Sequence, residues 1–191
     1  HELDVRREEL LSYSEYLFAR PDLKKNNAIN YMRMLKPFYA EALQQLMTFF
    51  YVGQKQPAKA MARVSAQISR VPNNATYHLM LGLLYLQTRD LDKAESAFQK
   101  TLELDKNNLD AFIALGQVAV ARGSVDKAVE TYQHSIQMNP RDLRSYMLLA
   151  DLEGSRGNWQ KAQELYKKVL QIVPDYPIAA NNLAYSMLEH G

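Results

Sequence analysis

The chain has 191 residues, 47% of them hydrophobic and 23% charged, and these proportions exclude a wholly disordered protein. Seven glycines and seven prolines are too few for the many turns of an all-β sandwich or barrel. A formal net charge of +2 gives no case for a nucleic-acid-binding face, and the absence of cysteine excludes disulfides, thiolate metal sites and cysteine nucleophiles.

The N-terminal residues are charged and show no apolar segment typical of a secretion signal, and no apolar run in the chain approaches the length of a membrane span. We therefore expect a soluble chain, in either the cytoplasm or the periplasm. Within 1–40, apolar residues predict one helix that ends before Pro21 and a second that ends near Pro37.

A period of 34 residues organises the remainder of the chain. The dipeptide Lys-Ala recurs four times at this spacing. One register holds an apolar residue five times in succession: Met47, Leu81, Leu115, Leu149 and Leu183. Another register holds Gly82 and Gly116 and continues with Ala150 and Ala184. Registers that persist over this many periods are the sequence signature of stacked structural repeats.

Each repeat is predicted to form two helices. Within 75–108, residues 77–86 are apolar almost all round, as expected of a helix that is covered on several sides. Residues 94–102 instead carry the one-sided apolar stripe of an amphipathic helix. No segment shows the sustained alternation of a strand. The fold class is therefore predicted to be all-α, built from helical hairpins.

Turn residues support these hairpins. Asp92 followed by Glu95 fits a capping box that opens the second helix of its repeat. Gly123 and Gly157 stand in the equivalent turns of the next two repeats, where a left-handed helix end favours glycine. The small-residue register that contains Gly82 is expected to face the alanines of the second helix and to let the two helices pack closely.

This pattern resembles the tetratricopeptide repeat (TPR), whose signature has a large residue, Leu-Gly, Ala, an aromatic residue and a closing Pro. The repeat 109–142 carries these residues as Phe112, Leu115, Gly116, Ala128, Tyr132 and Pro140. The resemblance covers about 41–191 and implies a right-handed superhelical solenoid. Its repeats would be 41–74, 75–108, 109–142, 143–176 and a partial fifth repeat at 177–191. Extending the register back makes 1–40 a degenerate N-terminal cap.

In the family that the chain resembles, the first helices line a concave groove. Carried over position by position, the resemblance implies a partner-binding groove formed by Gln45, Phe49, Leu79, Leu83, Asp110, Ile113, Gln117, Arg144, Met147, Asp151, Asn181 and Tyr185. Ile178 also occupies a groove position. The groove would be apolar in its middle with a polar rim, which suits an extended segment or an amphipathic helix of another protein.

Other interpretations of these residues stay open. The leucines of the groove are also typical of a core stripe. Arg144 and Asp151 are also compatible with a surface salt-bridge lattice. A subset of the family clamps chaperone tails with Lys and Asn at the fifth and ninth positions of the first helix, but Gln45 and Phe49 stand there in this chain. Capture of chaperone tails is therefore not expected.

No residue pattern predicts catalysis. The four histidines have no metal-binding spacing, no glycine-rich phosphate loop follows a strand, and the carboxylates are scattered over predicted turns and exposed faces. We therefore predict that the protein is not an enzyme and that it has no cofactor and no metal.

The leading functional hypothesis is a protein–protein interaction scaffold or adaptor that binds a partner peptide or helix in its concave groove. The alternative is an architectural or self-assembly segment of a larger multi-repeat protein, with cell-envelope assembly as one setting. In that case 177–191 is the candidate for self-association, because Ile178, Leu183, Met187 and Leu188 would lie on a helix without a second helix to cover it.

Overall fold

The computed structural model describes residues 51, 53 and 56–190, and all of its regular secondary structure within these residues is α-helical. The prediction of an all-α chain is confirmed for this part. The chain divides into two compact units, an N-terminal unit of 1–72 and a C-terminal unit of 73–191. The predicted cap at 1–40 lies outside the described residues. No helix that the structure describes is long and apolar enough to cross a membrane.

The described part of the N-terminal unit centres on helix α4 (Pro57–Arg70). Pro57 opens this helix, where the missing N–H of proline costs no hydrogen bond. Ala60 and Val64, one turn apart, are its buried residues. The Lys59 ammonium lies 6.0 Å from the centroid of the Tyr51 ring, within reach of a cation–π contact.

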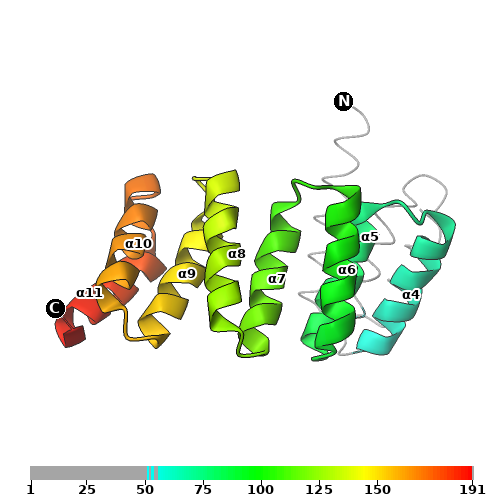
Figure 1. The fold of residues 1–191 in the computed structure, drawn as a ribbon, viewed down its shortest axis with the longest axis horizontal. Helices are drawn as coiled ribbons and strands as arrows, with labels where there is room; N and C mark the ends of the chain where they lie inside the picture. Colours follow the sequence, from blue (N-terminus) through cyan, green and yellow to red (C-terminus); the bar gives the residue numbers. More distant parts are fainter. Residues whose placement is uncertain (1–50, 52, 54–55, 191) are drawn as a thin grey trace, which may run out of the picture. The chain divides into compact units, whose positions relative to one another are not determined.

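The C-terminal unit is a row of helical hairpins (Figure 1). Its helices are α5 (Ala75–Gln87), α6 (Leu91–Leu104), α7 (Leu109–Ala121), α8 (Val125–Met138), α9 (Leu143–Ser155), α10 (Trp159–Ile172) and α11 (Pro177–His190). The closest packing joins α5 with α6, α7 with α8 and α9 with α10, and each hairpin then packs against the next. We call α5, α7, α9 and α11 the first helices of their repeats, and α6, α8 and α10 the second helices.

Side chains at the N-termini of the helices satisfy backbone N–H groups. The Asn74 amide oxygen accepts from the backbone of Thr76 at 3.0 Å and caps α5. The predicted capping box of Asp92 and Glu95 is wrong. Asp90, two residues earlier, caps α6 by accepting from the Lys93 N–H at 3.4 Å, so that Asp92 lies inside the first turn.

The turns between the two helices of each hairpin use the left-handed backbone region. Gly123 has φ +74° and Gly157 has φ +79°, which confirms the prediction made for these glycines. Arg89 holds the same place in the preceding hairpin with φ 60°. An L-residue in this region is strained by about 1–2 kcal/mol, whereas glycine adopts it freely.

Arg89→Gly is therefore expected to raise the free energy of unfolding by about 0.5–1 kcal/mol, because relief of the strained φ outweighs the extra entropy of glycine in the unfolded chain. Urea unfolding followed by circular dichroism measures the change. The matched control is Gly123→Arg, which should destabilise by a similar amount although no atom lies within 4 Å of a Cβ at that position. A lower midpoint for Arg89→Gly would contradict the prediction.

Aromatic rings of the second helices cover the small residues of the first helices. A Cβ built on Gly82 would lie 2.6 Å from Cδ1 of Phe98, and one built on Gly116 would lie 2.8 Å from Cδ1 of Tyr132. The nearest atoms to Gly82 and Gly116 thus belong to aromatic rings, whereas the expectation named the alanines of the second helix; Ala150 and Ala162 do share one buried cluster. In α9 and α10 the pair is Ala150 with Tyr166, both members of one buried cluster.

Ion pairs join successive hairpins. Arg122, which ends α7, reaches Asp92 at 2.6 Å and Glu95 at 2.7 Å on α6. Arg156 holds the same position in the next hairpin and contacts Asp126 of α8 at 2.9 Å. Hydrogen bonding from Lys127, with the charge of Arg122, lowers the pKa of Glu95. Since most of these groups are exposed, each pair contributes no more than about 1 kcal/mol.

Candidate protein-binding groove

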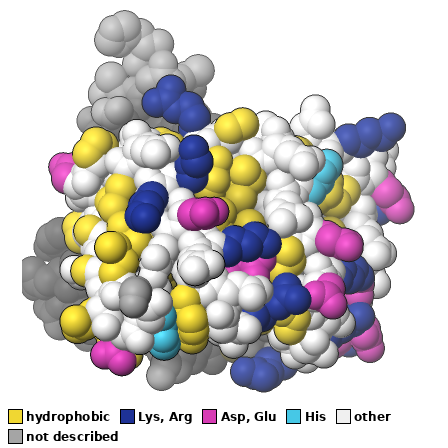
Figure 2. Space-filling view, turned by 60° about the vertical axis from the view of Figure 1, so that its left-hand side comes forward, with side chains coloured by type: hydrophobic (Ala, Val, Ile, Leu, Met, Phe, Trp, Pro, Cys, Tyr) yellow, Lys and Arg dark blue, Asp and Glu magenta, His cyan; other side chains and the backbone are white. Residues whose placement is uncertain are grey.

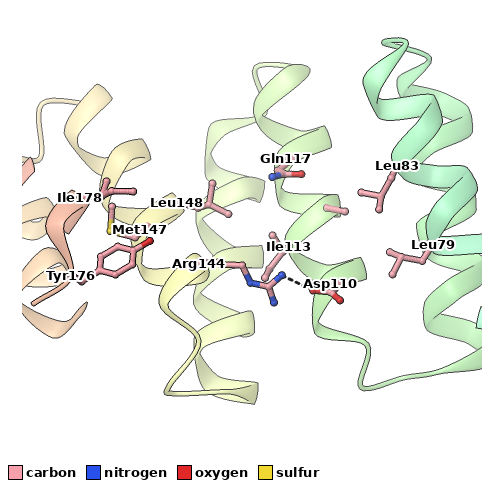
Figure 3. A pocket seen from close by; sticks show the side chains of 11 residues that line it. Leu79, Leu83, Asp110, Ile113, Gln117, Arg144, Met147, Leu148, Tyr176 and Ile178 are labelled. Carbon is pink, nitrogen blue, oxygen red and sulfur yellow. Dashed lines mark hydrogen bonds and ion pairs between the residues drawn. The ribbon is translucent and has the colours of Figure 1, made fainter. Parts of the chain in front are cut away.

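An open cavity of about 580 Å³ crosses the first helices of the C-terminal unit. Figure 3 shows side chains from α5, α7, α9 and the start of α11 that line it. The lining residues are Leu79, Leu83, Asp110, Ile113, Ala114, Gln117, Arg144, Met147, Leu148, Tyr176 and Ile178. We call this cavity the groove.

The 34-residue register explains how these residues come together. Leu79, Ile113 and Met147 hold one position on three successive first helices, so stacking places them in a row. Asp110 and Arg144 likewise share one position on α7 and α9. The groove is therefore built from equivalent positions of neighbouring repeats, as in other helical solenoids.

Exposure separates the apolar residues of the groove into two kinds. The Leu83 side chain is 44% exposed and the Ile178 side chain 55%, although both line the cavity. Ile113 is buried, and Leu79 is half-buried against the cluster that contains Phe98. The interpretation as core therefore applies to Ile113 and in part to Leu79, and it does not apply to Leu83.

Arg144 forms an ion-pair network at one edge of the groove. One nitrogen of its guanidinium group donates to Asp110 of the neighbouring first helix at 2.7 Å, as Figure 3 shows, and its Nε donates to Asp142 at 3.1 Å. Asp142 also caps α9 by accepting from the Ser145 N–H at 3.0 Å. The hydrogen bond to Asp110 is the main reason why the pKa of Arg144 is raised. Arg144 thus belongs to a salt-bridge set, but Asp151 is not its partner.

The remaining predicted groove residues lie elsewhere. Asp151 accepts a hydrogen bond from the Tyr166 hydroxyl at 2.6 Å and one from Asn182 at 3.4 Å, and so it links α9, α10 and α11. Burial, followed by the bond to Asp151, raises the pKa of Tyr166 to about 12. Asn181 and Tyr185 are exposed on α11 and do not line the cavity. Gln45 and Phe49 lie outside the described residues.

Sequence reasoning missed Ala114, Leu148 and Tyr176 as lining residues. Ala114 and Leu148 each follow a predicted groove position by one residue on the same helix. Tyr176 precedes α11, and a search confined to helix positions does not reach it. The one available signal would have been a large aromatic residue directly before Pro177, the first residue of a helix.

Within the described residues, no group of three or more His, Asp or Glu side chains is placed to hold a metal ion. The chemistry that the groove offers is instead apolar contact along three helices, with the paired charges of Asp110 and Arg144 at one edge and the amide of Gln117. This combination suits recognition of a polypeptide.

Stacked hairpins with a 34-residue spacing, an aromatic ring over a small residue and a groove lined by first helices define a tetratricopeptide-repeat protein. More narrowly, the chain belongs to the family of the TPR domain of cytochrome c-type biogenesis protein H, and the model of that family matches residues 58–177. The predicted resemblance to the TPR family is thereby confirmed. No curated protein matches the chain.

Solved structures share the fold. A crystal structure of MamA is 22% identical, covers 74% of this chain and 83% of its own, and superposes with a TM-score of 0.63. MamA 41-end from Desulfovibrio magneticus RS-1 is 18% identical over 78% of this chain and 84% of its own, with a TM-score of 0.64. TTC0263, a thermophilic TPR protein of Thermus thermophilus, is 17% identical over 98% of this chain and 100% of its own, with a TM-score of 0.76. At these identities the likeness concerns the fold alone.

Proposed function

We propose that the C-terminal unit is a non-catalytic binding module whose groove holds an amphipathic segment of a partner protein. The observation that carries the proposal is the open groove across three first helices, with the half-exposed Leu83 on its wall. A large apolar side chain that stays exposed beside a cavity gains free energy when a partner covers it, and for Leu83, which is 44% exposed, the gain is about 1 kcal/mol.

The charges at the edge of the groove favour one orientation of the partner. Arg144 is shared between two carboxylates, those of Asp110 and Asp142, so this edge carries a net charge of about −1. A basic or neutral polar side chain of the partner fits there, and an acidic one is disfavoured. The apolar face of the same segment would cover Leu83 and Met147.

The description of the family indicates the process in which the proposed partner takes part. Since the family is described as the TPR domain of a cytochrome c-type biogenesis protein, we propose a polypeptide of that process as the occupant of the groove. The likeness to MamA and to TTC0263 concerns the fold and adds nothing about the partner. The proposed role is to hold a chain while other proteins act on it.

Leu83→Ala is expected to weaken binding of such a segment about fivefold, because the variant loses about 1 kcal/mol of apolar contact. Fluorescence anisotropy of labelled peptides that tile a c-type cytochrome measures Kd. The free energy of unfolding should fall by only about 1 kcal/mol, which leaves the chain folded, because Leu83 is 44% exposed in the free chain.

The control is Met187→Ala, which removes a comparably exposed side chain that does not line the groove and should leave Kd unchanged. If the control weakens binding and Leu83→Ala does not, the peptide binds α11 and the groove is not the site. If no peptide binds at all, the proposed partner class is wrong.

A further inference from the structure

Gln117 brings an unused amide group to the groove. Its side chain is half-buried on α7, and Figure 3 shows it between the side chains of Leu83 on α5 and Leu148 on α9. Within the part of the chain that the structure describes, its carboxamide neither donates nor accepts a hydrogen bond. A side-chain amide can donate two hydrogen bonds and accept two. The groove therefore offers a donor and an acceptor among apolar side chains.

The equivalent residue of the next repeat shows that this amide is a particular feature of α7. Asp151 holds the place of Gln117 on α9, but its carboxylate accepts a hydrogen bond from the Tyr166 hydroxyl at 2.6 Å. Tyr132 holds the place of Tyr166 on α8, yet no hydrogen bond joins it to Gln117 among the described residues. The hairpin thus uses the polar group of Asp151 internally and leaves that of Gln117 to a partner.

The charged groups of the groove are already paired. The Arg144 guanidinium donates to Asp110 at 2.7 Å and to Asp142 at 3.1 Å. Figure 2, which brings the end formed by α10 and α11 forward, shows Lys and Arg side chains interspersed with Asp and Glu side chains, so that face presents no surface of a single sign. The Gln117 amide, unlike the Arg144 guanidinium, is therefore available to a partner.

An unpaired side-chain amide matches the backbone of an extended segment. In such a segment the backbone N–H and C=O groups have no partners within the segment, whereas a helix uses all but its terminal groups internally. Gln117 can accept from an N–H and donate to a C=O of one extended segment. Without this pairing, backbone groups would be covered by Leu83 and Leu148 at a cost in free energy.

The dimensions of the groove also favour an extended segment. A helix is about 10 Å across, so about 7 Å of its length would fill the cavity of about 580 Å³. Neighbouring helices lie about 8–10 Å apart, and the cavity reaches from α5 to the start of α11. A helix therefore cannot lie within the groove along its length, whereas a narrower extended segment can.

The spacing of the repeats sets the period of the occupant. The α5 helix contacts α7, and the ion pair of Asp110 with Arg144 joins α7 to α9. Leu79, Ile113 and Met147 are thus presented in a row at intervals of about 8–10 Å. Three residues of a polyproline II segment advance about 9.3 Å and return to the same face. A β-strand turns residues three positions apart to opposite faces and does not match this spacing.

We infer that the groove binds a partner segment in the polyproline II conformation, with an apolar side chain at every third position and its backbone hydrogen-bonded to Gln117. The inference rests on the function proposed above, because it specifies the conformation of the segment that the groove holds. The row of Leu79, Ile113 and Met147 selects the spacing of the apolar side chains. Gln117 selects the extended backbone.

The test is an NMR titration of the ¹⁵N-labelled 191-residue chain with two synthetic peptides. One consists of four repeats of Leu-Ser-Pro, which favour the polyproline II conformation and keep N–H groups at two of every three positions. The other is a helix-forming peptide of Ala, Lys and Gln with leucines seven positions apart. The side-chain amide resonances of Gln117 are expected to shift and to saturate with the first peptide only. A scrambled Leu-Ser-Pro peptide should bind about tenfold more weakly, because its leucines lose the spacing.

Gln117→Leu separates the hydrogen bonds from apolar contact. The variant should bind the Leu-Ser-Pro peptide about fivefold to tenfold more weakly, because two hydrogen bonds are lost. A groove that binds by apolar contact alone would instead bind the peptide more tightly after this change. The matched control is Gln137→Leu, at an exposed position of α8 outside the groove, which should leave Kd unchanged. Circular dichroism checks that both variants are folded.

Three outcomes would overturn the inference. These are the absence of shifts in the groove at millimolar Leu-Ser-Pro peptide, equal or tighter binding of the helical peptide, and undiminished binding by Gln117→Leu. If peptides of a c-type cytochrome bind and Gln117→Leu does not weaken them, the groove is a binding site but the conformation inferred for its occupant is wrong. If the Leu-Ser-Pro peptide binds as expected and the cytochrome peptides do not, the inference stands and the partner class proposed above is wrong.

Discussion

Gly116→Ala is expected to lower the free energy of unfolding by about 1–3 kcal/mol, although alanine favours a helix more than glycine does. The added Cβ would lie 2.8 Å from Cδ1 and 2.9 Å from Cζ of the Tyr132 ring. That ring is one of the largest fully enclosed side chains and has little room to move. Burial also raises the pKa of the Tyr132 hydroxyl to about 12, as expected of a phenol held away from water. Urea unfolding measures the loss.

The controls separate the steric clash from a general effect of the substitution. Gly154→Ala places a Cβ at an ordinary distance of 3.4 Å from Trp159 and should be neutral or slightly stabilising. A double variant with Tyr132→Leu should recover part of the stability lost by Gly116→Ala, because the smaller side chain makes room for the methyl group. Equal effects at Gly116 and Gly154 would show that the contact with the ring is not the cause.

Lys161→Met is expected to destabilise the chain by about 2 kcal/mol at neutral pH. Its partner Glu153 is only 1% exposed and accepts hydrogen bonds from the Lys161 ammonium and from the Asn158 amide, the latter at 2.7 Å. Without the ammonium, a buried carboxylate loses its cation, and this costs more than the loss of a surface pair. This expected loss of stability is smaller than that caused by breaking a fully buried ion pair, because Lys161 is itself half exposed.

The pKa shift of Glu153 determines how the stability of the chain depends on pH. Burial alone would raise the pKa of Glu153, but the hydrogen bonds from Lys161 and Asn158 outweigh it and hold the pKa below its ordinary value. In the native chain, the stability contributed by Glu153 is therefore present above its unfolded pKa, about 4.3, and is lost as the pH falls through the folded pKa. In Lys161→Met, burial dominates and the pKa of Glu153 rises.

The difference in unfolding free energy between the native chain and Lys161→Met should therefore be largest near neutral pH and should narrow as the pH falls toward about 4, where the carboxyl becomes neutral in the variant. Urea unfolding across this range measures it. Lys167→Met, on an exposed position of the same helix, is the control and should show little loss at any pH. A deficit for Lys161→Met that does not change with pH would contradict the role given to Glu153.

The fold could be predicted because its determinants repeat. A small residue at Gly82 and Gly116, with an aromatic residue 16 positions later, recurs with the period of the hairpin. The residue that caps each helix was harder to predict. Asp90 and Asp92 both stand near the start of α6, and the choice of cap depends on backbone dihedral angles that sequence spacing does not fix.

The groove could be predicted in part for the same reason. Leu79, Ile113 and Met147 line one cavity because they share a register. Asp151 also lies on the register of groove residues, but its carboxylate is held by Tyr166, whose hydroxyl comes from another helix. Glu153 gave no sequence signal, because nothing in the order of residues shows that Asn158 and Lys161 converge on it in a buried place.

Glu153 also distinguishes α9 from the other first helices, which are otherwise similar. Stacked repeats carry the risk that a first helix pairs with the wrong second helix, in its own chain or in another. Paired with α6 in the same register, Glu153 would meet Lys93 at the place of Lys161 but Asp90 at the place of Asn158, so a carboxylate would replace the amide that donates to Glu153. Of the two side chains that donate to Glu153, Asn158 is therefore the one that distinguishes α10 from α6 as a partner of α9.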